Sequence, residues 1–246
     1  AFACGLATVK PSAGRVPAFL PSATQERPFL ASQMSAQGVI AREVSDVRIG
    51  LKAIIEPDPR DPWHIPLELS EGEPNQSIKI ALTRETYGFP VDDSVIAALD
   101  MAAQMLREAG YEVNEVETPS VHELAKKWCA MTFGEMQLML DDTIRELGSA
   151  EFQRLFADYC ALSDSIESGS YVHEMAERTR LAREWSLFLN DYPLMLSPFQ
   201  LTETHSVDAD LLGLDALTAV FNGLIYSTGF NYIGLPAGVI PAGYDS

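Results

Sequence analysis

The four histidines are the first candidates for catalytic groups in this 246-residue sequence, because only histidine titrates near neutral pH without help from its surroundings. His122 and His173 each precede a glutamate, in HELAK and HEMAE. Neither is followed by a second histidine four positions after it, so the HExxH pattern of zinc proteases is absent. We therefore interpret both residues as parts of solvated helical faces, and the sequence predicts no metal site.

His205 lies beside Ser206 and close to Asp208 in TETHSVDAD, which brings together the three residue types of a Ser–His–Asp triad. Such a triad requires its members to converge in space around an oriented base, and close neighbours in sequence rarely do so. No GxSxG motif is present to expose a nucleophilic serine, and His64 stands in a proline-rich stretch. Taken on their own, the residues nominate no catalytic group, and we favour a structural role for His205.

The cysteines and glycines give no sign of a metal or a cofactor. Cys4, Cys129 and Cys160 are odd in number, widely spaced and without a CxxC pair, which argues against a disulfide framework and a zinc site. Neither GxGxxG nor GxxxxGK[ST], the loops that cradle phosphates, occurs in the sequence. We expect reduced thiols, no cofactor and a cytoplasmic location.

The excess of acidic residues limits the kinds of molecule that the chain is expected to bind. Aspartate and glutamate number 35 against 17 lysines and arginines, which gives a net charge of −18. Such a surface repels phosphate backbones and anionic lipids, so we expect neither nucleic acid nor a membrane as a partner. No apolar run approaches the roughly 20 residues that cross a bilayer, and the basic start of a signal peptide is missing. With 47% hydrophobic residues, the chain should fold around a core.

The first quarter of the chain contains one clear helical pattern. Residues 1–37 are rich in proline, alanine, serine and glycine without a sustained period, and we expect an irregular surface segment there. From Ile40 to Ile55 apolar residues recur at spacings of three and four, as one face of a helix requires. Pro57 and Pro59 then end that helix, because proline donates no backbone hydrogen bond.

A β-α-β unit is predicted next. SIKIALT favours a strand at residues 78–83. Asp92 or Asp93 can cap a helix that ends at Gly110, and YEVNEVE stands where a second strand belongs. Such units build parallel sheets through right-handed crossovers.

The second half of the chain has mostly helical patterns. Residues 120–190 predict two or three helices, with breaks near ELGSAEF and SDSIESGS. PLMLSP is too short and too continuously apolar for an amphipathic helix, and it predicts a buried strand. A helix at 211–226 and the apolar LPAGVIPAG complete the pattern. We expect a mixed α/β protein with a helical layer.

Three stretches, spread over nearly the whole chain, carry recognisable motifs: CGLATVKPSAGRVP, GVIAREVSDVRIGLKAIIEPDPRDP and FNYIGLPAGVIPAG. In the same order, they resemble landmarks of the amidase signature family. The first is similar to the segment that follows the family's Gly/Ser-rich signature, the second to the next landmark helix, and the third to an Asn-x-x-Gly-Leu-Pro-Ala stretch. Val39 replaces the usual proline of the second landmark. The residues that we treat as structural landmarks are Cys4, Gly5, Lys10, Pro11, Arg42, Asp46, Asn231, Gly234 and Pro236.

The resemblance implies a mixed, largely parallel β-sheet core flanked by helices, with residues 1–246 as a single partial domain truncated at both ends. In that family a serine nucleophile, a second serine on a cis peptide bond and a lysine cleave amides through an acyl-enzyme. All three are expected upstream of Ala1, so no catalytic residue is assigned within the chain. Lys10 aligns with a landmark lysine outside that triad, and we interpret it as a structural charge.

The implied function is that of a portion of an amidase, which converts a small carboxamide to a carboxylate and ammonia without metal or cofactor and is inactive as an isolated chain. Two alternatives stay open: an amidotransferase A-type subunit, and a non-catalytic interaction module derived from the same fold. A homodimer, or association with the missing part of the domain, would cover exposed apolar edges. Five residues are candidate walls of the acyl pocket, with ordinary core packing as the alternative: Trp128, Met131, Phe133, Pro198 and Phe199.

Overall fold

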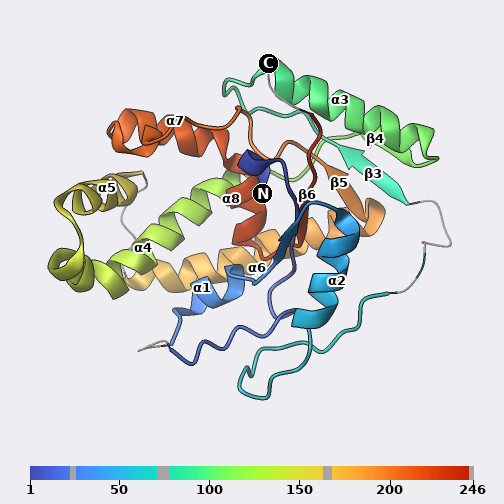
Figure 1. Ribbon diagram of the computed structural model, residues 1–246. Coiled ribbons are helices and arrows are strands. Elements are labelled where there is room, and N and C mark those ends of the chain that lie inside the picture. Colours follow the sequence, from blue (N-terminus) through green and yellow to red (C-terminus); the bar gives the residue numbers. More distant parts are fainter. Residues whose placement is uncertain (23–25, 71, 73–77, 163–167, 244–246) are drawn as a thin grey trace.

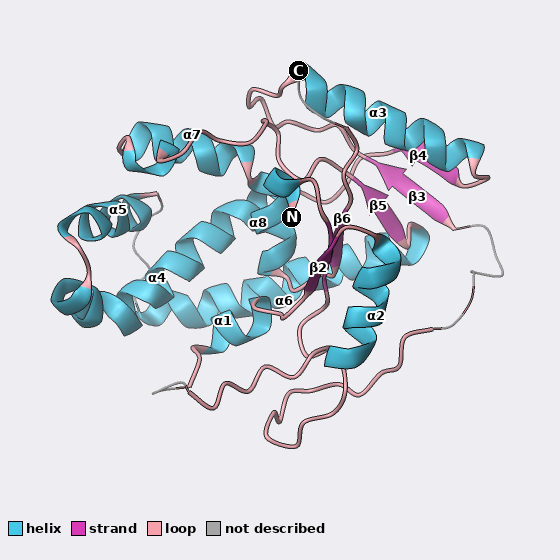
Figure 2. Ribbon diagram, in the orientation of Figure 1, coloured by secondary structure: helices cyan, strands magenta, loops and turns pink. Residues whose placement is uncertain are grey.

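Two small sheets and a layer of helices make up the molecule (Figures 1 and 2). The computed structural model describes residues 1–22, 26–70, 72, 78–162 and 168–243. One three-stranded sheet is parallel and the other is antiparallel. The mixed α/β fold class that the sequence predicts is therefore confirmed.

The parallel sheet has the strand order β4-β3-β5. Its strands are β3 (Lys79–Leu82), β4 (Glu112–Glu115) and β5 (Leu194–Leu196), and α3 (Asp93–Glu108) crosses over from β3 to β4. The predicted β-α-β unit is present, and so is a strand in PLMLSP, but this strand is not buried as predicted: Leu194 is 49% exposed and the rest of β5 is only partly buried. Five buried side chains form a small core between α3 and this sheet: Ile80, Leu82, Leu99, Ala103 and Val113.

The antiparallel sheet joins the two ends of the chain. β1 (Ala7–Lys10) is its central strand, with β2 (Val39–Ala41) on one side and β6 (Ala237–Val239) on the other. Val9 is the pairing partner of both Val39 and Gly238. Residues from both ends of the sequence therefore lie side by side, as Figure 1 shows near the point marked N.

Two sequence expectations for the first part of the chain were wrong. Residues 1–37 contain β1, the short 3-10 helix η1 (Phe2–Cys4) and α1 (Phe29–Met34) in addition to loops. Ile40 lies in β2, so the helix predicted from that residue begins later, as α2 (Val44–Ile54). β1 and β2 form by pairing with strands distant in sequence, and a local pattern carries no information about such a partner.

The helical layer contains the longest elements of the protein. They are α4 (Val121–Leu147), α5 (Ala150–Ala161), α6 (Ser168–Asp191), α7 (Leu214–Gly223) and α8 (Ile225–Tyr232), with the 3-10 helix η2 (Ala209–Leu211) before α7. Ser120 and Ser149 cap α4 and α5, each accepting a hydrogen bond at 3.1 Å from the backbone N–H three residues later. The helix predicted at 211–226 is divided in two at Leu224.

The main core lies where α4, α6 and α8 meet. α8 approaches α4 so closely that a Cβ atom at Gly229 would lie 2.9 Å from the carbonyl oxygen of Val121. A larger residue at position 229 would push the two helices apart. The largest side chains that are fully buried in this core are Trp185, Tyr226, Tyr232, Met131, Leu30, Leu124, Leu181 and Leu201.

Glu135 is a buried carboxylate that ties three helices together. Its side chain accepts hydrogen bonds from the backbone N–H groups of Leu30 (3.2 Å) and Ala31 (3.0 Å) at the start of α1. The hydroxyl of Tyr171, on α6, donates to the same carboxylate at 2.7 Å. A buried charge with three donors is well compensated, so Glu135 of α4 fixes the positions of α1 and α6.

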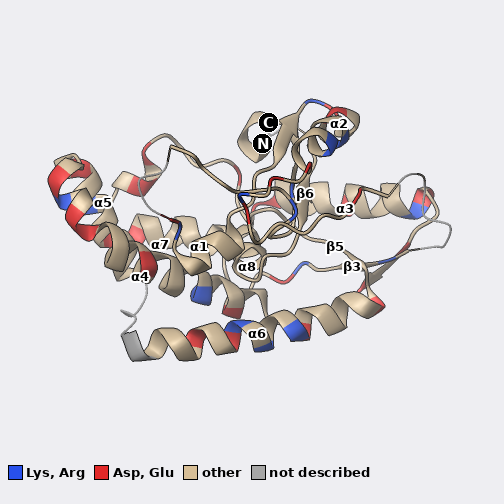
Figure 3. Cartoon of the chain, turned by 90° about the horizontal axis from the view of Figure 1, so that it is seen from below, with Lys and Arg blue, Asp and Glu red and all other residues tan. Residues whose placement is uncertain are grey.

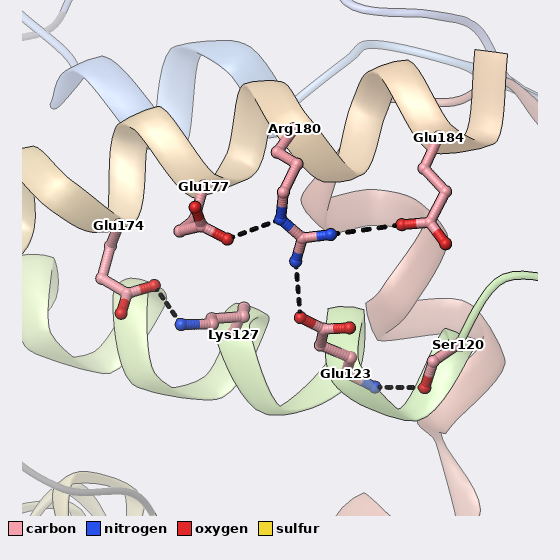
Figure 4. A network of polar contacts seen from close by, with 7 residues as sticks. All are labelled: Ser120, Glu123, Lys127, Glu174, Glu177, Arg180 and Glu184. Atoms are coloured by element: carbon pink, nitrogen blue, oxygen red, sulfur yellow. Dashed lines mark hydrogen bonds and ion pairs between the residues drawn. The ribbon is translucent and has the colours of Figure 1, made fainter. Parts of the chain in front are cut away.

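A network of ion pairs joins the exposed sides of α4 and α6 (Figure 4). Arg180 contacts Glu123 at 2.9 Å, Glu177 at 2.7 Å and Glu184 at 3.3 Å. Lys127, one turn after Glu123 on α4, pairs with Glu174 on α6. In Figure 3, acidic residues colour parts of α4 and α5 red, and acidic and basic residues alternate along α6. Because Arg180 is about half exposed, we expect its pairs to contribute little to stability.

Candidate functional site

A cluster of aromatic rings joins α4, α5 and α7. Phe133 stacks on Tyr159 with ring centroids 4.8 Å apart. Phe221 meets Phe133 edge-on at 5.6 Å and Tyr159 edge-on at 5.9 Å, and Trp128 lies 5.7 Å from Phe133. Edge-to-face pairs of this kind stabilise one mutual orientation of the rings beyond the effect of burying their surface. The cluster is therefore a well-defined aromatic wall.

A cavity of about 220 Å³ lies against this wall. Tyr159 and Phe221 belong to both the wall and the lining of the cavity. The side chains around the cavity come from α5, from the segment around η2 and from α7: Tyr159, His205, Ser206, Ala209, Asp210, Leu217, Val220, Phe221 and Leu224. Most of the lining is apolar, with a few polar groups, as is usual for small-molecule sites.

His205 enters the cavity from a loop that is held firmly in place. The backbone N–H of Leu201 donates to the carbonyl oxygen of Gly223 at 2.8 Å, which ties the loop to the end of α7. The side-chain amide of Gln200 donates to the carbonyl oxygens of Thr202 and Glu203, both at 2.7 Å. The Nε2 atom of His205 is buried and finds no hydrogen-bond partner among the described residues.

The polar side of the cavity is not a catalytic triad. His205 and Ser206 both line it, but within the described residues no hydrogen bond joins them. Asp208 is not part of the lining and has a left-handed backbone conformation (φ 62°) at the start of η2. The carboxylate that lines the cavity belongs to Asp210. Burial, together with this carboxylate, raises the pKa of Tyr159. Tyr159 therefore presents a neutral phenol.

Trp128 is oriented by a hydrogen bond to α8. Its indole N–H donates to Oδ1 of Asn231 at 2.8 Å. The amide nitrogen of Asn231 donates to the carbonyl oxygen of Met34, at the end of α1, at 3.1 Å. Asn231 therefore connects α1, α4 and α8 directly behind the aromatic wall.

The thiols offer no reactive nucleophile next to the aromatic wall. All three cysteines are free. Burial raises the pKa of Cys129 to about 12, and burial together with the nearby Asp141 raises that of Cys160. Within the described ranges, no group of His, Cys, Asp and Glu side chains is arranged to hold a metal ion.

A model of the amidase family matches residues 1–246. The chain belongs to the amidase family. Over 238 residues it is 37% identical to an indoleacetamide hydrolase of Bradyrhizobium diazoefficiens, an alignment that covers 96% of this chain and 45% of that protein. The glutamyl-tRNA(Gln) amidotransferase A subunit of Staphylococcus saprophyticus is 26% identical over 271 residues, which cover 99% of this chain and 54% of that protein. The chain thus spans about half the length of these curated relatives.

Solved structures support the same fold for this amidase-family chain. A 6-aminohexanoate cyclic dimer hydrolase superposes with a TM-score of 0.78 at 20% identity, covering 100% of this chain and 55% of that one. Fatty acid amide hydrolase gives a TM-score of 0.68 at 15% identity, with 96% of this chain and 41% of that chain covered. At such identities the likeness concerns the fold alone.

The family landmarks near the N-terminus of this amidase-family chain surround β1. Gly5, in a left-handed conformation, ends η1, and the neighbouring Cys4 is exposed. Lys10 ends β1, and its ammonium group donates to the carbonyl oxygen of the buried Pro11 at 3.3 Å. Burial lowers the pKa of Lys10 to about 8. Lys10 is not in the lining of the cavity.

The other landmarks lie at β2, α2 and the end of α8. Arg42 and Asp46 are exposed near the start of α2. Gly234 has a left-handed conformation (φ 74°), and a Cβ atom there would lie 3.0 Å from the carbonyl oxygen of Gln33, so the turn after α8 needs glycine. Pro236 is exposed and directly precedes β6.

The five residues that the sequence nominated as pocket walls lie in two regions, and none belongs to the lining of the cavity. Trp128 and Phe133 contact the lining rings from behind. Met131 is fully buried in the main core. Pro198 is buried, and Phe199 stacks on Phe2 with centroids 5.0 Å apart. A pocket role for these five residues stays a prediction.

Within the described residues, no helix is both long and apolar enough to cross a membrane.

The sequence analysis did not identify three of the cavity-lining residues as pocket residues: Tyr159, His205 and Phe221. They come from separate elements and share no motif, so only the folded arrangement brings them together.

Proposed function

We propose that this chain is part of an amidase that hydrolyses the primary amide of an arylacetic acid to the carboxylate and ammonia. The observation that carries the proposal is the 37% identity with an indoleacetamide hydrolase over 96% of the chain. The cavity supports it, because Tyr159 and Phe221 offer flat aromatic surfaces to a flat aromatic ligand.

In this proposal the chain contributes the binding of the acyl group. The serine nucleophile, the second serine and the lysine implied by the family resemblance would precede Ala1, in line with relatives about twice as long as this chain. Trp128 and Phe133 would support the pocket by holding the lining rings in place. Met131, Pro198 and Phe199 remain candidates for other parts of its wall.

An amidotransferase A-type subunit is the second candidate, because relatives with that name match almost the whole chain. The cavity argues against it. Glutamine carries an α-carboxylate, which proteins usually bind through arginine or lysine, and neither residue type lines the cavity. A non-catalytic module remains the third candidate, and it differs from the others by showing no hydrolysis with any amide.

We also propose a cytoplasmic location and a partner for the exposed apolar surface. The three free cysteines support the location, because disulfides are rare in the reducing cytoplasm. Ile40, Val44 and Ile49 are each more than half exposed at β2 and α2. Apolar side chains grouped in this way are often covered by another part of a protein or by a second copy.

The experiment is a substrate panel for the full-length protein, with indole-3-acetamide, phenylacetamide, propionamide and L-glutamine. Released acids are identified by mass spectrometry. We expect the two arylacetamides to be hydrolysed fastest. Phe221→Ala should slow the hydrolysis of arylacetamides at least about tenfold more than that of propionamide, whereas Leu138→Ala, at an exposed position of α4, should change neither. A preference for glutamine, or no hydrolysis of any amide, would contradict the proposal.

A further inference from the structure

We propose that the cavity between α5, η2 and α7 binds an arylalkyl ammonium ion, with the carboxylate of Asp210 as its counter-ion and the rings of Tyr159 and Phe221 as aromatic walls. The inference goes beyond the proposed function, because it concerns the charge of the bound group and requires no hydrolysis. If the cavity holds the aryl part of an acyl group, Asp210 favours acyl groups that carry a positive charge.

The carboxylate of Asp210 has no cation beside it. Asp210 is the only aspartate, glutamate, lysine or arginine in the lining of the cavity. Within the described residues its side chain forms no ion pair and no hydrogen bond, and its one electrostatic contact is with Tyr159. The residues outside the described ranges include neither lysine nor arginine. A negative charge at the edge of an apolar cavity without a counter-ion favours a ligand with a positive charge.

This carboxylate is accessible to a ligand. Asp210 is half-buried, and neither of its oxygen atoms is among the buried polar atoms without a partner, so both oxygen atoms contact solvent. Its charge also acts on Tyr159, because this carboxylate contributes, after burial, to the raised pKa of the phenol. Both side chains line the same cavity. The carboxylate and the phenol are therefore neighbours there.

The aromatic part of the lining attracts a cation as well. The rings of Tyr159 and Phe221 are inclined at 85° to each other, with centroids 5.9 Å apart. Phe133 stacks on one face of Tyr159, so the Tyr159 ring offers its other face and its edge to its surroundings. A cation over the face of a tyrosine or phenylalanine ring, within about 6 Å of the centroid, is attracted by the electrons of the ring. Organic ammonium ions are typically recognised in this way.

The remaining features of the cavity select an organic cation with one aromatic ring. Leu217, Val220 and Leu224 give the lining an aliphatic part that an aromatic ring can contact. The volume of about 220 Å³ lies below the roughly 300–1,000 Å³ of pockets for drug-sized ligands. A hard metal ion needs several oxygen ligands, and no group of acidic, histidine or cysteine side chains within the described ranges could hold a metal. The net charge of −18 attracts cations from solution.

A matched pair of ligands tests the preference for charge. 2-Phenylethylammonium and 2-phenylethanol have nearly the same shape, and only the first is charged at pH 7. Dissociation constants for the full-length protein are measured by NMR titration. The wild type should bind the ammonium ion about tenfold more tightly than the alcohol, through one partly exposed ion pair and one cation–π contact.

Variants show whether Asp210 is the counter-ion. Asp210→Asn keeps the shape of the side chain and removes its charge, so the preference for the ammonium ion should fall to about threefold or less, while binding of the alcohol stays within about twofold. Asp208→Asn is the matched control, because Asp208 is exposed two residues away and does not line the cavity. It should leave both dissociation constants within about twofold. Val220→Trp, which fills the cavity, should abolish binding of both ligands.

Four results would overturn the inference: no saturable binding of the ammonium ion, no preference for it over the alcohol, equal losses in Asp210→Asn and Asp208→Asn, or unaltered binding in Val220→Trp. Equal losses would mean that the ammonium ion responds to the negative charge of the whole surface. Unaltered binding in Val220→Trp would place the ion outside the cavity. The alcohol monitors folding, because an unfolded variant binds neither ligand. None of these outcomes depends on catalysis, so failure of the arylacetamide assay is a separate result.

Discussion

Trp128 donates its indole N–H to the side-chain oxygen of Asn231 at 2.8 Å, so a residue of the family's C-terminal landmark sets the orientation of a ring in the aromatic wall. The amide nitrogen of Asn231 donates to the carbonyl oxygen of Met34. One amide side chain thereby satisfies two polar groups from different helices. Asn231 of this landmark therefore has a structural role in this chain: its hydrogen bonds connect α1, α4 and α8.

Replacing Asn231 should destabilise the protein. In Asn231→Leu the indole N–H and the carbonyl of Met34 each lose their partner, and we expect a loss of about 2–4 kcal/mol in the free energy of unfolding. Urea denaturation followed by circular dichroism measures the loss. Asn190→Leu is the control, because that exposed asparagine makes only a 3.5 Å contact with Asp191. A loss below about 0.5 kcal/mol for Asn231→Leu would show that the bridge is unimportant.

Glu135 should be the most sensitive carboxylate of α4. Glu135→Leu leaves two backbone N–H groups of α1 and the hydroxyl of Tyr171 without an acceptor, at a cost on the order of 3–5 kcal/mol. Glu135→Gln retains acceptor oxygen and should cost less. The exposed Glu146 on the same helix provides the control, since Glu146→Leu should change stability by less than about 0.5 kcal/mol. Equal losses at the two positions would refute the role given to Glu135.

The titration of Lys10 should increase the free energy of unfolding as the pH rises from about 8 to 10. Burial lowers the pKa of Lys10 to about 8 from its ordinary value of 10.5. Between these values the unfolded chain holds a proton that the folded chain has lost, so the free energy of unfolding increases with pH. Below pH 8 both states are protonated, and the folded state carries the cost of a partly buried charge.

Lys10→Met removes this titration. We expect the variant to be about 1–2 kcal/mol more stable at pH 7, after allowing for solvent screening of a partly exposed group. Its stability should also rise less between pH 8 and 10 than that of the wild type. Denaturation midpoints measured at half-unit steps of pH test both statements. Parallel stability curves for the two proteins would rule out the assigned cause.

A polypeptide limited to residues 1–246 should show no amidase turnover, because the catalytic residues implied by the family resemblance are expected to precede Ala1. A fluorophosphonate probe, which labels activated serines, should leave this polypeptide unlabelled and should label the full-length protein. Peptide mapping by mass spectrometry identifies any labelled residue. Rapid labelling of a serine within residues 1–246 would contradict this assignment.

The β-α-β unit was predictable because its signals are local. The β-branched run in SIKIALT and the stop at Gly110 each act within a few residues, and a helix that connects two neighbouring strands makes those strands parallel. The side chain of Asp92, which the sequence offered as a cap for α3, instead accepts a hydrogen bond from the backbone N–H of Glu203. The antiparallel sheet was not predictable in the same way. Val9 pairs with Gly238, near the other end of the chain, and nothing in the short stretch ATVK indicates that partner.

The candidate site likewise combines features that the local sequence predicts with features that depend on the packing of distant elements. Trp128 and Phe133 could be nominated from residue type and helical context, although they support the cavity from behind rather than line it. The convergence of Tyr159, His205 and Phe221 depends on how α5, the loop before η2 and α7 pack. The sequence analysis considered His205 because Ser206 and Asp208 lie close to it in the sequence. In the fold it lines a cavity together with Tyr159 and Phe221.

The most direct test of the central claim is a comparison of kcat/KM for indole-3-acetamide and for L-glutamine, measured as ammonia release by the full-length protein. We expect indole-3-acetamide to be preferred by at least about 100-fold, because the cavity offers aromatic surface and no lysine or arginine for an α-carboxylate. Equal values, a preference for glutamine, or no ammonia from either amide would contradict the assignment of this chain to an arylacetamide hydrolase.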